Sequence, residues 1–323
     1  MRLSVIFAVC ILAMSAPALA RPLEPGDIPA TAQVVVHVDV DALQKSKTRA
    51  MFDKQVDDLK AEVNSELNLE GIPFKVSDLA RATGVTFWAE GDEAEHGALI
   101  VRGLDIKRMI TALGAVKGYR LSNRGGHAIH QIDNGDETTY IGIRGATLVI
   151  ADDSKSVETS LDVLAGRATS LARSAKAARL GKARGVLFAA VFEQKIAEKI
   201  QREANSGIFK KIKFKGGLIY ARESTDKLIA RAVIETSDAA GANQLHKLAA
   251  GAIAFFDIAS DDPDLATLLD AVKIQSSNAT VTFTLALPFA TIEKLIPVID
   301  SKRKDHDHER GHGAGSDVTG NAP

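Results

Sequence analysis

Cysteine is almost absent from this chain of 323 residues, in which Cys10 is the only one. A single cysteine cannot form an intrachain disulfide or build a cysteine-ligated metal site. Aromatic residues make up only 5% of the chain, too few for the stacking platforms of single-strand nucleic-acid binding proteins. The longest later apolar run, Leu248–Phe256, contains Gly251 and is too short to span a bilayer. Disulfide-stapled and multi-spanning membrane classes are therefore excluded.

Sequence motifs that carry chemistry are also missing. The chain has no Gly-x-Ser-x-Gly, no His-Glu-x-x-His, no Walker loop, no Gly-x-Gly-x-x-Gly and no EF-hand loop. The 40 basic residues nearly balance the 41 acidic ones, which argues against a protein built around nucleic acid. The sequence names no catalytic residues, so a non-enzymatic protein is favoured over an enzyme.

The first twenty residues have the three regions of a secretory signal. Arg2 gives a positive start, residues 3–14 are almost wholly apolar, and Ala18 and Ala20 are small residues ahead of a cleavage point. We expect cleavage after Ala20, which also removes Cys10 and with it any thiol nucleophile. Residues 21–32 contain three prolines and are predicted to form an extended linker. The mature protein is expected in the periplasm or outside the cell, with no transmembrane segment.

The remaining pattern predicts an α+β fold made of two similar units. Residues 33–168 and 185–300 each show strand–helix pairs, a hairpin and alternating strands, joined by a basic, alanine-rich connector at 169–184. We expect each unit to be an antiparallel sheet with helices packed on one face. Within the first unit, Asp41 and Gln44 have the spacing of a capping box, which predicts a helix from there to about residue 67. Residues 301–323 lack anchoring apolar groups and are predicted to be a disordered His/Asp-rich tail.

Two groups of residues have metal-ligand chemistry. His37, Asp39 and Asp41 are spaced at i, i+2 and i+4, which on a strand places all three side chains on one face. The other interpretation is structural, with a polar face on the strand and Asp41 as a helix cap. His306, His308 and His312 lie among carboxylates in the tail and could wrap a divalent transition metal, although a flexible tail has no preformed geometry. No other cofactor is expected.

A third group could bind an anionic partner. Lys211, Lys213 and Lys215 alternate with Ile212 and Phe214, which predicts a strand with one cationic face. The simpler interpretation is an ordinary solvated face. His127 and His130 are at i and i+3 in a predicted strand, so they are expected on opposite faces and cannot share one ion.

The segment Gln33–Leu43, a valine-rich strand followed by an aspartate and a helix directly after a signal and a Pro-rich linker, resembles the start of uncharacterised exported bacterial proteins. The resemblance implies an envelope protein of unknown function and transfers no site residues. The favoured hypothesis is a non-enzymatic exported binding or scaffold protein with a protein or anionic envelope partner. The alternatives are a metal-dependent hydrolase using His37, Asp39 and Asp41, and a metal-capturing protein acting through its tail. Oligomeric state is left open.

Overall fold

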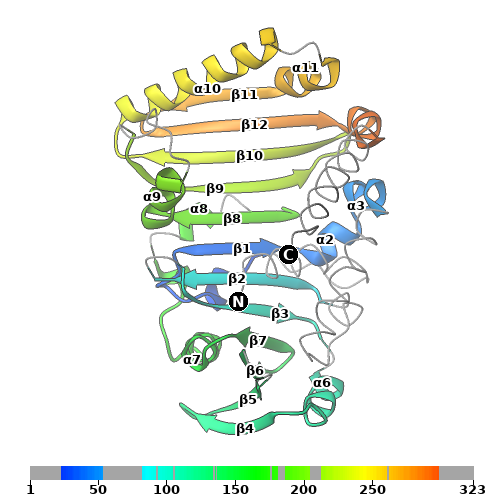
Figure 1. Ribbon diagram of the computed structural model, residues 1–323, viewed down its shortest axis with the longest axis vertical. Helices are drawn as coiled ribbons and strands as arrows, with labels where there is room; N and C mark the ends of the chain where they lie inside the picture. The colour runs from blue at the N-terminus through cyan, green and yellow to red at the C-terminus, as the bar shows by residue number, and fades with distance from the viewer. Residues whose placement is uncertain are drawn as a thin grey trace, which may run out of the picture.

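The strands form one continuous antiparallel sheet in the computed structural model (Figure 1), which describes residues 23–53, 82–91, 94–104, 106–133, 135, 137–174, 177–180, 186–203, 212–259 and 262–297. The sheet has twelve strands in the order β11-β12-β10-β9-β8-β1-β2-β3-β7-β6-β5-β4. The predicted signal peptide and the predicted tail, with His306, His308 and His312, lie outside the described residues, and so do Lys211 and the end of the predicted connector. No described helix is long and apolar enough to cross a membrane.

The strands and helices have the following bounds. The strands are β1 (Val34–Val38), β2 (Gly84–Glu90), β3 (His96–Arg102), β4 (Tyr119–Arg124), β5 (His127–Asp133), β6 (Thr138–Arg144), β7 (Thr147–Ala151), β8 (Phe188–Glu193), β9 (Phe214–Glu223), β10 (Lys227–Thr236), β11 (Val272–Ser277) and β12 (Thr280–Pro288). The helices are η1 (Pro25–Asp27), α2 (Val40–Gln44), α3 (Lys47–Met51), α6 (Ile106–Leu113), α7 (Ser154–Leu164), η2 (Leu171–Arg173), α8 (Ala177–Leu180), α9 (Gln194–Glu203), α10 (Ala239–Ala259) and α11 (Pro263–Asp270). Residues 289–297, after β12, are also helical.

The pairing of β1 with β8 joins the two predicted units. Val36 of β1 lies opposite Ala190 of β8, and on its other side opposite Phe87 of β2. The α+β class is confirmed. Each predicted unit was expected to contain an antiparallel sheet, and whether the two sheets are continuous was left open. The pairing of β1 with β8 merges them into one sheet.

The strand register shows which residues share a face of the sheet, because directly opposed residues on neighbouring strands project to the same side. The first row runs through Phe87, and we call this side the Phe87 face; it continues as Val36, Ala190, Ile219, Ala232, Phe283 and Ile274. The second row runs through Trp88, and we call this side the Trp88 face; it continues as Val35, Val191, Leu218, Val233, Thr282 and Gln275.

Both faces are buried around β2 and β3. On the Phe87 face, Phe87 and Leu99 pack in one core cluster with Leu43 of α2 and Leu113 of α6. On the Trp88 face, Trp88 packs in a second cluster with α7, and its indole Nε1 donates to Ser160 Oγ at 3.0 Å. Helices were expected on one face only. This expectation is wrong here because β2 and β3 carry apolar side chains on both sides, and each side needs a cover.

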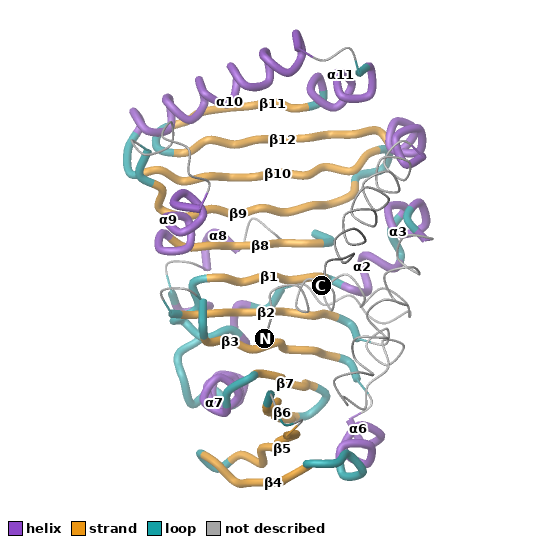
Figure 2. Tube along the Cα trace, viewed as in Figure 1, coloured by secondary structure: helices purple, strands orange, loops and turns teal. Residues whose placement is uncertain are grey.

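The outer strands are covered mainly on the Phe87 face. There α10 packs Leu245 against Val281 of β12, and residues 289–297 pack Phe289 and Ile292 against Leu287. Figure 2 shows α10 crossing the sheet at β11, at the end of the molecule opposite α7 and α6. On the Trp88 face, no side chain of β11 or β12 belongs to a hydrophobic cluster of the described residues. This end of the sheet therefore keeps a polar, open side.

The predicted linker and connector are part of the fold. Ile28 is fully buried, Leu171 is 2% exposed, and both pack in the Trp88-face core. A β-bridge joins Pro29 to Ser170. The predicted extended linker and the described part of the predicted basic, alanine-rich connector thus pack against each other on the Trp88 face, because their few apolar residues fit that core.

Candidate functional site

The first predicted metal group does not form a common face. Strand β1 ends at Val38, and Asp41 lies inside α2, so the i, i+2, i+4 alternation stops before it reaches Asp41. His37 is on the Trp88 face, 3% exposed, with Nδ1 2.9 Å from Thr86 Oγ1. Burial, helped by the nearby positive charge of Arg102, lowers the pKa of His37 to about 3. The imidazole is therefore a neutral core group at ordinary pH.

The two aspartates have separate roles in the helix start. Asp39, not Asp41, is the N-cap of α2, and its Oδ1 accepts from the Ala42 backbone at 2.9 Å. Burial raises the pKa of the Asp39 carboxyl above its usual value. Asp41 is fully buried and forms an ion pair with Lys45 at 2.8 Å. The described part of the chain contains no group of three or more His, Cys, Asp or Glu side chains able to hold a metal ion.

The helix that starts at Asp39 is shorter than predicted. Ser46 caps a new helix, α3, by accepting from the Arg49 backbone at 2.9 Å. The capping serine breaks the predicted long helix into α2 and α3, and the part beyond residue 53 lies outside the described residues.

Two of the three predicted surface lysines can be placed. Lys213 precedes β9 and Lys215 is on it, and both are exposed. Lys215 lies where the β9–β10 register shifts, between the pairs that join Phe214 to Thr236 and Gly216 to Glu235. The bulge interrupts the alternation, so the predicted regular cationic face does not extend along β9 from these lysines.

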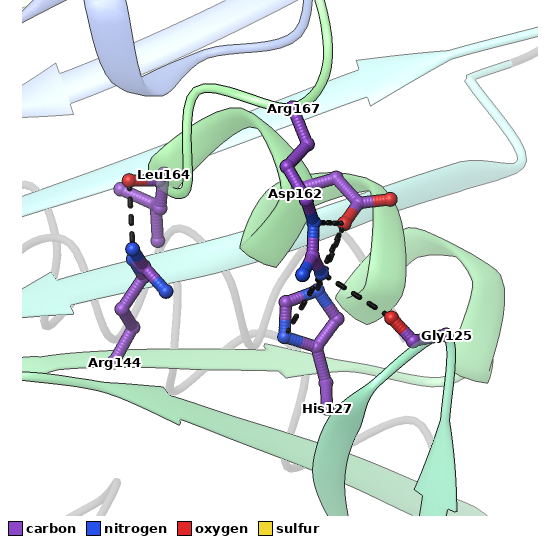
Figure 3. A network of polar contacts seen from close by, with 6 residues as sticks. All are labelled: Gly125, His127, Arg144, Asp162, Leu164 and Arg167. Atoms are coloured by element: carbon purple, nitrogen blue, oxygen red, sulfur yellow. Dashed lines mark hydrogen bonds and ion pairs between the residues drawn. The ribbon is translucent and has the colours of Figure 1, made fainter.

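A polar cluster ties the β4–β5 hairpin to the end of α7 (Figure 3). Asp162 Oδ1 accepts from Arg167 Nε at 2.8 Å and lies 2.9 Å from His127 Nε2. The hydrogen bond with His127, and then Arg167, holds the pKa of Asp162 below its usual value. Arg167 also donates to the Gly125 carbonyl at 3.3 Å, and Arg144 to the Leu164 carbonyl at 3.1 Å. These contacts close the hairpin turn over the helix end, a structural role.

A different cluster is found on the Trp88 face of the outer strands. Arg231 of β10 is directly opposite Tyr220 on one side and Thr284 on the other, and Thr284 is opposite Lys273 of edge strand β11. We call six of the polar side chains that are exposed or half-exposed on this side the outer polar face; half-exposed Ile229 and Ala286 lie on the same side. The outer polar face consists of Arg222, Arg231, Lys273, Gln275, Thr282 and Thr284.

The positive charge of this face is not neutralised by the strands beneath it. Among the described residues of β9 to β12, only Glu235 is an acidic side chain on the Trp88 face. Its Oε2 accepts from Arg179 Nε at 3.1 Å and Nη2 at 2.5 Å, while Arg179 also binds Glu193 at 2.7 Å. Arg231 forms no ion pair with the described residues, and its buried Nε has no hydrogen-bond partner among them. A buried guanidinium N–H without an acceptor is costly, so this face favours an anionic ligand.

Sequence reasoning missed this face although its signal is in the chain. Thr282, Phe283 and Thr284 alternate polar and apolar residues, which is the pattern of a strand with one solvated side. Arg231 stands alone in an apolar run, Leu228–Ile234. The signal is incomplete without strand order, because β11 and β12 must be known to follow β10 before Lys273 can be placed beside Thr284.

An exposed apolar end marks α10. Phe255, Phe256 and Ile258 are 66%, 52% and 86% exposed, and they lie beyond the part of the helix that packs Leu245 on the sheet. Asp257 lies between Phe256 and Ile258 in the sequence. The helix is an apolar element on the opposite side of the sheet from the outer polar face.

Comparisons with known proteins give little more. No family model matches the chain, and no curated protein matches it. Solved structures similar to it include three crystal forms of TP0453, a bacterial protein from Treponema. Crystal form III has a TM-score of 0.45 and 11% identity over 86% of this chain and 98% of that chain; crystal form I has a TM-score of 0.46 and 11% identity over 85% and 96%. At this level the similarity carries no argument about function.

Proposed function

We propose that this chain is an exported, non-enzymatic binding protein whose binding surface is the outer polar face. The observation that carries the proposal is Arg231, whose buried Nε lacks an acceptor in the middle of an open sheet face with Lys273 and Arg222. Charge-assisted hydrogen bonds from guanidinium and ammonium groups to an anion are about twice as strong as neutral ones. The partner is an anionic component of the cell envelope.

Export is the part of the proposal that rests on the signal-like start. Residues 1–20 have the charged, apolar and small-residue regions of a secretory signal. The protein is then released into the periplasm or beyond it after cleavage at Ala20. Intact mass measurement of the protein recovered from the envelope fraction tests this step. A mass starting at Arg21 supports it, and a mass that includes residues 1–20 contradicts it.

The metal-dependent hydrolase is the weaker alternative. His37, Asp39 and Asp41 are each engaged in the fold, by Thr86, the start of α2 and Lys45 respectively. Using them as ligands would require those contacts to break in the buried core.

We further propose that the sheet consists of two related units that have diverged in function. In spatial order, β1-β2-β3-β7-β6 follows the same path as β8-β9-β10-β12-β11. In both, the first three strands are neighbours in chain order and a helix follows later in the chain. The second strand of the last hairpin then pairs with the third strand, as β7 does with β3 and β12 with β10. The β4–β5 hairpin is an addition to the first unit. On this proposal, the binding face belongs to the second unit alone.

The binding proposal is tested on a polypeptide of residues 21–323 with a panel of immobilised anionic polymers at 150 mM salt, roughly the physiological ionic strength. The variant Arg231→Gln/Lys273→Gln removes two charges from the outer polar face. The matched control, Lys247→Gln/Lys294→Gln, removes two charges from exposed positions on α10 and residues 289–297. Loss of retention in the first variant but not in the control supports the proposal. Equal retention of both variants and the unchanged protein contradicts it.

The same panel separates the two basic surfaces. Lys213→Gln/Lys215→Gln removes the placed part of the lysine group first identified from the sequence. If only this variant loses retention, the anionic partner binds there and the proposal for the outer polar face is wrong.

A further inference from the structure

The outer polar face alternates charged groups with neutral hydrogen-bonding groups. In one cross-strand row, Arg231, Thr284 and Lys273 are neighbours; in the next, Thr282 is opposite Gln275. Residues on adjacent strands are about 5 Å apart, so Arg231 and Lys273 are separated by about 10 Å with a threonine between them. A ligand that matches this face carries anionic groups separated by hydroxyl or other neutral polar groups.

Recognition on this face must come from side chains. Strand β10 is hydrogen-bonded to β9 and β12, and β12 is hydrogen-bonded to β10 and β11. The backbone N–H and C=O groups beneath Arg231 and Thr282 are therefore already paired. An extended peptide that binds by adding a strand needs unpaired backbone groups, and β10 and β12, which carry Arg231, Thr282 and Thr284, do not offer them.

The face is also unlike a bilayer-docking surface. The side chains at its centre are short hydroxyls on a rigid sheet, while the exposed apolar groups, Phe255, Phe256 and Ile258, are on α10, which packs on the other side of the sheet. A helix or surface that enters a bilayer presents apolar residues together with its cations. Here the cations are on one face of the sheet, and the helix that carries the exposed apolar residues packs on the other.

We propose that the outer polar face binds an acidic polysaccharide whose repeating units carry carboxylates and hydroxyls. Arg231 and Lys273 bind successive carboxylates, and Thr282, Thr284 and Gln275 exchange hydrogen bonds with the sugar hydroxyls between them. The planar guanidinium of Arg231 matches a carboxylate with two parallel N–H donors, which a lysine cannot reproduce. This inference rests on the proposed function, and it identifies the chemical class of the partner.

The test is calorimetric titration of the residue 21–323 polypeptide with oligogalacturonate at 150 mM salt, roughly physiological ionic strength. The matched neutral ligand is the same oligomer with its carboxylates methyl-esterified. We expect binding of the acid form, none of the ester, and a loss of about tenfold or more in affinity with Arg231→Gln. Arg231→Lys keeps the charge and is expected to recover only part of the affinity. The variant Thr282→Val/Thr284→Val keeps all charges and is also expected to lower the affinity for oligogalacturonate.

Two further ligands separate the outcomes. Polyphosphate has charge without sugar hydroxyls, and vesicles of phosphatidylcholine with phosphatidylglycerol present an anionic bilayer. Binding of either one, lost with Arg231→Gln/Lys273→Gln, without binding of oligogalacturonate overturns the polysaccharide assignment and leaves the binding face intact. If no ligand shows a dependence on Arg231 and Lys273, both the assignment and the proposed function are wrong. Circular dichroism of each variant confirms that it is folded.

Discussion

The same cross-strand row has a buried end and an open end. It starts at Ala98 and Trp88, both fully buried under α7, and it ends at Thr282, which is half-buried, and Gln275, which is exposed. One sheet thus supplies a buried core at one end and an exposed polar surface at the other end of the same side. Because both ends belong to one continuous sheet, the difference in side-chain burial comes from the segments that pack on the sheet, such as α7 over Trp88.

The placement of one helix produces this difference. After β7, helix α7 packs Val157 and Leu161 on the Trp88 face. After β12, the helix at residues 289–297 packs Phe289 and Ile292 on the Phe87 face. On the Trp88 face, β11 and β12 have no helix of the described residues in a hydrophobic cluster with them, whereas Leu180 of α8 packs with β9 and β10. The residues of β12 and β11 on this side are mostly polar, as expected for strands that no helix covers there.

The largest effect is expected from the buried histidine in the centre of the sheet. His37 has a folded pKa of about 3 against 6.5 for the unfolded chain. A lowered pKa means that the unfolded state binds the proton first, so stability is intact above pH 6.5 and falls as pH drops toward 3. The loss is roughly 5 kcal/mol at most. Urea unfolding of the residue 21–323 polypeptide across this range should show a shallower pH dependence for His37→Gln.

An identical pH dependence in His37→Gln would show that His37 is not buried as a neutral group. Burial also lowers the pKa of His130. The variant His130→Gln therefore measures how much of the pH dependence of stability left in His37→Gln comes from His130.

The second prediction compares the two ends of the row directly. Trp88→Ala removes a fully buried indole and its bond to Ser160, and we expect a loss of about 3–5 kcal/mol in the free energy of unfolding. Thr282 is on the same face and is half-buried. We expect Thr282→Ala to lower the free energy of unfolding by less than about 1 kcal/mol. Trp88 is the only tryptophan, so Trp88→Ala has no tryptophan fluorescence to report unfolding. Chemical unfolding of both variants is therefore followed by circular dichroism. Similar costs at the two positions would remove the proposed contrast.

The third prediction uses two glycines with opposite surroundings. A Cβ at Gly142, under α7, would be 2.6 Å from both Leu161 Cδ1 and Val157 Cγ1, so Gly142→Ala should cost about 1–3 kcal/mol. A Cβ at Gly251, in α10, would meet nothing within 4 Å, so Gly251→Ala should stabilise the helix by about 0.5–1 kcal/mol. Thermal unfolding midpoints should shift in opposite directions. A gain in stability from Gly142→Ala would contradict the tight packing of α7.

Local patterns predicted much of this fold and little of its use. The alternation in β12 and the aspartate cap of α7 at Asp153 were visible in the sequence. Strand β2 was missed because it is apolar on both faces, so its run, Gly84–Glu90, lacks alternation. The β1–β8 pairing joins residues about 150 positions apart, and no local signal reports such a pair.

The candidate site shows the same limit. Arg231 is a visible anomaly in an apolar run, but its meaning depends on two facts from the structure. Glu235, the nearest acid along the strand, is bound by Arg179, and the helix after β12 turns to the other face. His37, Asp39 and Asp41 looked like ligands because the strand was expected to continue through Asp41; the cap at Asp39 ends that geometry.

The most direct test of the open outer face is thiol labelling of single cysteines placed in the same row. Cys10 is the only cysteine, so a polypeptide of residues 21–323 contains none, and Thr282→Cys and Ala98→Cys each supply one reporter. We predict that Cys at position 282 reacts in the folded protein without prior unfolding, whereas Cys at position 98 reacts only as fast as the protein unfolds. Added oligogalacturonate should slow the reaction at 282. Protection at 282 equal to that at 98 would show that the outer face is covered and would contradict the account.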